Sequence, residues 1–237
     1  MMKKFNAGLV LILICISGGA HAHGHEAEQV FSSVMVDRLE VRDSNKTGNS
    51  SNWEAQGWSG DELNKLWFKT QGDVNSGGTQ FADMQLLYSQ AVAAYWDVQL
   101  GARHDYGFNG LPSRDYAAVA LKGLAPYKFD VDASFYLGSM AAARVKAGYT
   151  LLLTQRLAIL PELEANWYGG NDIARGVGSG LSNLDFGLRL RYELSREFAP
   201  YVGINWANKY GETANFARLN GEPASEVMYV VGIRLWW

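Results

Sequence analysis

Two histidines, His23 and His25, lie close together near the start of the chain. If the chain is cut after Ala22, His25 becomes the third residue of a new N-terminus. An amine, two deprotonated backbone amides and an imidazole then form the square-planar nitrogen set that Cu(II) or Ni(II) prefers. The alternative is a flexible terminus whose histidines occur there by chance, and a cut shifted by one residue removes the third-position histidine.

Charged and amide side chains recur at every second position in four stretches, which places each set on one side of a strand. Charges that are enclosed together must be paired or hydrated. Two interpretations stay open: a salt-bridged network that narrows the enclosed space, or a polar path with a transient cation site made of carboxylates. The residues are Asp97, Gln99, Arg103, Asp130, Asp132, Glu162, Glu164, Asp185, Arg189, Arg191 and Glu193.

Two further metal donors stand apart from these sets. His104, beside Asp105, is expected near an outer rim, as a surface loop residue rather than a ligand. Met228 is the one soft donor expected to point inward, and alone it would hold copper weakly. His104 is also the only candidate base for catalysis, and no motif places it with Ser113 or Ser134, so we expect no enzyme activity. The candidate metal ligands are His23, His25, Asp97, His104, Glu162, Glu164 and Met228.

The elements that must position these residues are strands. The chain ends in "EVMYVVGIRLWW" (226–237), where Tyr229, Val231, Ile233 and Leu235 alternate with other residues. A period of two indicates a strand with two different faces. The same alternation recurs along the chain and predicts twelve strands, at roughly 31–42, 52–59, 63–73, 80–90, 92–105, 115–123, 128–138, 141–153, 156–168, 183–194, 198–207 and 225–237.

The predicted connections alternate between short and long. Short turns are expected near Gly60, Ser89, Pro126, Gln155 and Arg196, and long polar loops at 43–52, 105–114, 169–180 and 208–224. Short periplasmic turns, longer outside loops and an even strand number are typical of an outer-membrane barrel. Closure of the sheet is required as well, because unpaired backbone groups at an open edge cannot be satisfied in hydrocarbon.

The N-terminus predicts export. Lys3 and Lys4 precede the apolar run 7–17, and small residues then lead to Ala22, which fits a secretory signal over 1–22. A short periplasmic segment (23–30) and the barrel (31–237) would follow. Removal of the signal takes away Cys15, the only cysteine, and leaves 19 basic residues against 24 acidic ones. A nucleic-acid partner is therefore not expected.

The fold class predicted is all-β, a transmembrane antiparallel outer-membrane β-barrel of about 12 strands. A soluble sandwich also alternates, but it does not need an apolar set on nearly every strand opposite so many charges. Seven tryptophans are expected in an aromatic girdle at the membrane surfaces. Twelve strands enclose little open water compared with larger porins, so a narrow path is favoured over general diffusion. The seven are Trp53, Trp67, Trp96, Trp167, Trp206, Trp236 and Trp237.

Several long strings resemble the bacterial copper resistance protein B family, among them "LLYSQAVAAYWDVQLGARHD" (86–105), "LTQRLAILPELEANWYG" (153–169) and "REFAPYVGINWANKYGETANFAR" (196–218). The resemblance covers nearly all of the chain after the signal. It implies a Gram-negative outer-membrane protein that binds or passes copper ions, in contact with lipid and beside a periplasmic multicopper oxidase. Members often carry a long N-terminal extension rich in Met and His; here that segment is only "HGHEAEQV" (23–30), which argues against high-capacity copper storage.

Overall fold

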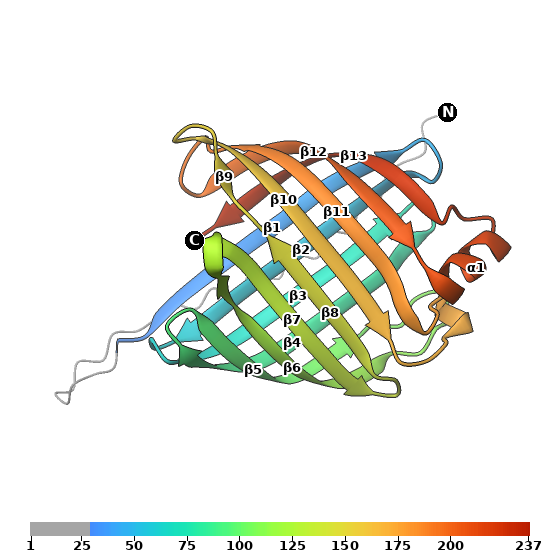
Figure 1. The fold of residues 1–237 in the computed structure, drawn as a ribbon, viewed down its shortest axis with the longest axis horizontal. Helices are drawn as coiled ribbons and strands as arrows, with labels where there is room; N and C mark the ends of the chain where they lie inside the picture. The colour runs from blue at the N-terminus through green and yellow to red at the C-terminus, as the bar shows by residue number, and fades with distance from the viewer. Residues whose placement is uncertain (1–28) are drawn as a thin grey trace.

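The computed structural model describes residues 29–237, which form one antiparallel sheet that closes on itself (Figure 1). Closure comes from the pairing of β10 with β11, and β9 continues the wall of β8, so the barrel has twelve strands as predicted. The strands are β1 (Phe31–Ser44), β2 (Gly48–Gly60), β3 (Asn64–Asn75), β4 (Gly78–Ala93), β5 (Trp96–Asp105), β6 (Arg114–Ala125), β7 (Phe129–Gly138), β8 (Ala142–Gly148), β9 (Leu151–Leu152), β10 (Leu157–Tyr168), β11 (Gly180–Tyr192), β12 (Phe198–Lys209) and β13 (Ser225–Trp236).

Apolar side chains cover the outside of the barrel. On β11, Phe186, Leu188 and Leu190 are exposed, whereas Arg189 and Arg191, which alternate with the two leucines, are buried in the lumen. A soluble protein buries its apolar face, but a barrel turns it toward lipid. Every strand belongs to one closed sheet, so no second sheet is present to cover that face, and the sandwich alternative is wrong for the described residues.

One end of the barrel carries short connections. They lie at 61–63, 94–95, 126–128, 153–156 and 193–197, as predicted except for the second, which we expected near Ser89. The reason is the length of β4: it continues through Val92 to Ala93, so the apolar run of 92–105 divides between two strands. In the first turn, Asp61 accepts hydrogen bonds from the backbone N–H groups of Leu63 and Asn64, and these hold its pKa below the ordinary value.

The other end, called here the long-loop end, carries the three longest connections, at 106–113, 169–179 and 210–224, together with short ones at 45–47, 76–77 and 139–141. The predicted loop at 43–52 is reduced to 45–47, because β2 already begins at Gly48. The loop at 208–224 contains helix α1 (Gly211–Leu219), which lies at this end of the barrel in Figure 1. The Thr213 hydroxyl accepts a 2.8 Å hydrogen bond from the Gly178 N–H, so α1 is fastened to the neighbouring loop, which holds the short helix η2 (Ile173–Arg175). No helix of residues 29–237 is long and apolar enough to cross a membrane.

The chain terminus completes the wall where β13 meets β1. The Trp237 N–H donates to the Val34 carbonyl at 2.9 Å, and the Val34 N–H donates to the Trp237 carbonyl at 3.0 Å. The last residue is therefore paired by its backbone and exposes its ring outward. Five of the seven tryptophans lie on the outward face, but Trp236 points inward and Trp67 is buried in the lumen, so the girdle prediction is wrong for these two.

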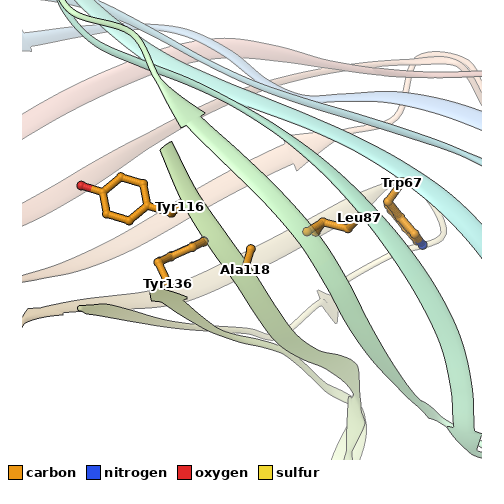
Figure 2. Close-up of a cluster of buried hydrophobic side chains, with 5 residues drawn as sticks. All are labelled: Trp67, Leu87, Tyr116, Ala118 and Tyr136. Carbon is orange, nitrogen blue, oxygen red and sulfur yellow. The ribbon is translucent and has the colours of Figure 1, made fainter. Parts of the chain in front are cut away.

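A buried apolar wall lines one side of the lumen over β3, β4, β6 and β7. Figure 2 shows Trp67 beside Leu87 at one end of this wall, with Tyr116 and Tyr136 at the other and Ala118 between. Leu87 is 1% exposed, although its neighbour Leu86 is 53% exposed to the lipid side. The inward set is therefore partly hydrophobic, and packing as well as charge fills the barrel.

Candidate cation compartment in the lumen

Ion pairs cross the middle of the lumen from wall to wall. Lys146 on β8 lies 2.6 Å from Glu54 on β2, and these strands are six steps apart in the sheet in either direction. Arg38 on β1 contacts Glu54 at 3.4 Å and also pairs with Glu162 on β10, which lies 3.6 Å from Lys146. This central layer, formed by Arg38, Glu54, Lys146 and Glu162, fastens opposite walls together. It is a salt-bridged network of the kind that one of the two sequence-based interpretations describes, although Glu162 alone of its four residues was named there.

A second buried centre lies on the lumen side of four neighbouring strands, β1, β13, β12 and β11. Glu40 accepts hydrogen bonds from Arg189 at 3.0 and 3.1 Å and from the Tyr201 hydroxyl at 3.0 Å. Gly232 on β13 makes room for this arrangement, because a Cβ there would lie 2.6 Å from the Tyr201 ring. The Arg42 guanidinium, 2.7 Å away, is a second cationic partner of the same carboxylate. Glu40 is thus fully committed to protein partners.

Most acidic side chains in the short-turn half of the lumen lie close to a lysine or arginine side chain. Lys69 donates to Asp132 and to Gln99, both at 2.9 Å. Lys122 lies 4.1 Å from the centre of the Trp67 ring, a cation–π contact that fills the space beside this pair. At the rim, Asp97 is 3.9 Å from Lys65 and Glu193 is 3.2 Å from Arg191, whereas Asp130 is exposed at the mouth.

The long-loop half contains a cavity of about 160 Å³. Glu164 and Asp185 line it from β10 and β11, and they are register partners, directly opposite each other. Glu164 accepts a hydrogen bond from Asn166 at 3.1 Å, and Asp185 accepts one from Asn183 at 2.9 Å. Among the described residues, neither carboxylate has an ion-pair partner. The remaining lining residues are Arg38, Arg42, Asn52, Trp53, Glu54, Gln71, Gly72, Phe81, Glu162, Gly187 and Asn205.

The sequence-predicted ligands do not form one cluster. Glu162 and Glu164 share the cavity, but Asp97 lies at the short-turn rim and the buried Met228 does not line the cavity. His104 belongs to β5 rather than to a loop, which corrects that prediction, and it faces outward. Within residues 29–237, no group of three or more His, Cys, Asp or Glu side chains is arranged to hold a metal. The predicted signal (1–22), His23 and His25 lie outside the described residues.

Sequence reasoning missed the residues at the centre of the lumen. Glu40, Glu54 and Lys146 all occupy inward positions. Glu54 and Lys146 pair with each other across the barrel, and Glu40 pairs with Arg189, three strands away along the wall. The signal was available for one of them: Glu40 alternates with Arg38 and Arg42 in the same way as the charged residues in the four stretches of the sequence analysis. Alternation does not predict which residue on the opposite wall is the ion-pair partner, because that depends on how the sheet closes and on strand register.

Comparison with known proteins places this barrel in a family. A family model described as Copper resistance protein B precursor (CopB) matches residues 30–237. The chain belongs to the copper resistance protein B family. A Copper resistance protein B homolog of Pseudomonas syringae pv. tomato is 42% identical over 220 residues, covering 90% of this chain and 74% of the relative. Copper resistance protein B of Escherichia coli is 38% identical over 222 residues, with 93% and 74% covered.

Solved structures similar to this family member are outer-membrane barrels. The NanC porin has a TM-score of 0.56 at 13% identity, over 85% of this chain and 98% of the porin. Outer membrane phospholipase A from Escherichia coli has a TM-score of 0.50 at 14% identity, over 86% and 92%. At these identities the likeness concerns the fold alone. This member of the family is thus an outer-membrane barrel, as its sequence predicted.

Membership of the copper resistance protein B family favours a non-catalytic protein, whereas the barrel fold itself is shared by a porin and by a phospholipase. Of the candidate catalytic residues, Ser134 and His104 do not meet. Ser134 is buried in the lumen and donates to Asp132 at 2.8 Å, whereas His104 lies on the outer face of the wall. A hydroxyl and an imidazole on opposite faces of a sheet cannot exchange a proton directly.

Proposed function

We propose that this copper resistance barrel binds copper ions in the long-loop half of its lumen and passes them across the outer membrane. Copper is cargo in this scheme, not a resident cofactor. The observation that carries the proposal is the Glu164 and Asp185 pair. Two carboxylates directly opposite each other across a ladder repel, and a bound cation would turn that repulsion into attraction.

Carboxylate and amide oxygens at this cavity suit a hydrated cation more than tight, permanent capture. Asn166 and Asn183 already donate to the two carboxylates, at 3.1 and 2.9 Å, and each carboxylate keeps further lone pairs free. Oxygen ligands hold copper less tightly than thiolates or imidazoles do. Weak binding is what passage requires, since an ion that enters must also leave.

Passage past the cavity requires the central layer to rearrange. Glu54 and Glu162, whose cationic partners are Arg38 and Lys146, line the cavity on the side that faces the short turns. A cation arriving from the cavity competes with Lys146 for the same carboxylates, because both carry positive charge. The path is therefore narrow and gated by displacement of ion pairs. The periplasmic multicopper oxidase implied by the family resemblance remains a prediction.

Copper flux into proteoliposomes tests the proposal. The full chain is reconstituted in vesicles that enclose a copper-sensitive dye, and Glu164→Gln with Asp185→Asn is compared with the unchanged protein. We expect the initial rate of copper influx to fall about tenfold, because both carboxylates that face the cavity lose their charge. Glu62→Gln is the matched control: it removes one carboxylate in an exposed short turn, and its influx rate should equal that of the unchanged chain.

Sodium influx, measured in parallel, separates copper handling from a general channel. A barrel that passes copper and sodium at the same rate, with both unaffected by the double substitution, would be a narrow channel without copper specificity. In cells, loss of the gene should change copper accumulation and survival in copper. The double variant should reproduce that change while its amount in the outer membrane is normal.

A further inference from the structure

On the outer wall, a methionine, a histidine and a carboxylate lie in one row across three strands. Met84 of β4 is the register partner of His104 on β5, and His104 is the register partner of Asp115 on β6. Register partners share one face of the sheet, with Cβ atoms about 4.5–5.5 Å apart. Arg103 and Asp105, on either side of His104, are buried in the lumen, so the row faces outward.

Asp115 fixes the tautomer of the His104 imidazole. The Nδ1 atom of His104 lies 2.7 Å from Oδ1 of Asp115. An ionised carboxylate only accepts hydrogen bonds, so in the neutral ring Nδ1 carries the proton and the lone pair of Nε2 is free. A carboxylate on the other ring nitrogen is the usual companion of a metal-binding histidine. The Tyr106 ring packs edge-on against the imidazole, with centroids 4.8 Å apart at 83°.

The row is accessible from the aqueous rim. His104 is the penultimate residue of β5 and Asp115 the second of β6, next to the connection 106–113 at the long-loop end. The side chains of His104 and Asp115 are 35% and 87% exposed. A carboxylate so exposed belongs at the headgroup level rather than in hydrocarbon, where ionised groups are costly. Ions in the external solution therefore reach this row without entering the lumen.

We propose that Met84 and His104 form a binding site for a soft monovalent metal ion, Cu(I) by its donors, on the outer wall of the barrel. A thioether sulfur and an imidazole nitrogen are the neutral, soft donors that this ion prefers. Asp115 acts as a positioning residue that holds Nε2 free. With two protein ligands the site exchanges its ion readily. It is separate from the lumen cavity and does not rest on the transport proposal.

Silver(I), a redox-inert ion with the same ligand preference, is the probe. The full chain, labelled with ¹⁵N at histidine, is held in detergent micelles and titrated with Ag(I). We expect the Nε2 resonance of His104, identified by its loss in His104→Gln, to move on titration while Nδ1 remains nearly unchanged. Met84→Leu, which keeps the side-chain volume, and Asp115→Asn should each weaken binding about tenfold.

Met228→Leu is the matched control, because it removes a thioether from the lumen side of the wall and should leave the His104 titration unchanged. An unmoved Nε2 resonance, or equal Ag(I) affinity in Met84→Leu and the unchanged chain, would overturn the site. The double substitution Glu164→Gln with Asp185→Asn separates the two proposals. It should slow copper influx yet leave the His104 titration as it was, so either proposal can fail without the other.

Discussion

In the short-turn half of the lumen, acidic side chains are matched by cations at close range. Asp132 lies 2.9 Å from Lys69, and Asp37 lies 3.2 Å from Arg234. Trp67 and Leu87 fill the space beside these pairs and are themselves buried. A charge that is paired in this way has little attraction left for an ion from solution. Paired charges and packed side chains therefore fill the lumen in this half.

In the long-loop half, two carboxylates that line the cavity lack a cation from residues 29–237 at ion-pair distance. Arg103 is shared between Asp83 at 3.2 Å and Asp105 at 2.6 Å, while Glu164 and Asp185 have no ion-pair partner in the described part of the chain. The two halves are made by the same strands with the same alternation. The difference shows that alternation of side chains along each strand makes the lumen polar. Ion pairs across the lumen decide which of its carboxylates stay available to a cation.

The largest effect should come from breaking the central layer between the halves. Glu54→Gln leaves Lys146 and Arg38 to share one carboxylate, that of Glu162, and removing one member of a buried ion pair costs about 3–5 kcal/mol. We expect the free energy of unfolding, measured with urea in detergent micelles, to fall by that amount. Single-channel conductance should rise, because the walls lose their link. If the free energy of unfolding falls no more in Glu54→Gln than in the turn control Glu62→Gln, the central layer does not link the walls.

Packing of the short-turn half should matter next. Leu87→Ala opens a cavity beside Trp67 and should lower the free energy of unfolding by about 3 kcal/mol. Leu86→Ala is the matched control, since its side chain points to lipid, where no cavity forms, and its cost should be about 1 kcal/mol. The comparison fails if the two substitutions destabilise the barrel equally in the same urea titration.

A smaller effect is expected on ion selectivity. Glu164→Gln with Asp185→Asn should lower the preference for cations over anions about threefold, because two unpaired negative charges leave the lumen. Reversal potentials across planar bilayers with a salt gradient report this ratio. Glu193→Gln removes a charge that is already paired with Arg191, so its reversal potential should remain close to that of the unchanged chain.

Most of the wall was predictable from local pattern, because hydrocarbon outside and charge inside impose a period of two on each strand. The alternation in "NLDFGLRLRYEL" (183–194) placed Asp185, Arg189 and Arg191 in the lumen, and the structure has them there. The turn expected near Ser89 was wrong, because Ala94 and Tyr95 form a turn with no Gly or Pro to mark it. Strand length is set by pairing with β3 and β5, not by the residues of β4 alone.

The candidate sites were only partly predictable. That Glu164 and Asp185 face inward follows from alternation, but their lack of a cationic partner depends on where Lys146 and Arg38 reach from other walls. The row of Met84, His104 and Asp115 on the outer wall was likewise only partly predictable. The sequence around His104 does not predict that Met84 and Asp115 are its neighbours, because the register of two strand pairs brings the three residues together.

Anomalous diffraction from crystals of the full chain soaked in copper tests the central claim most directly. The account predicts a copper peak in the long-loop half of the lumen, within coordination distance of Glu164 and Asp185, and its loss in the Glu164→Gln with Asp185→Asn variant. A lumen without copper under the same soak, or copper bound only at the paired carboxylates Asp132 and Glu193, would contradict it.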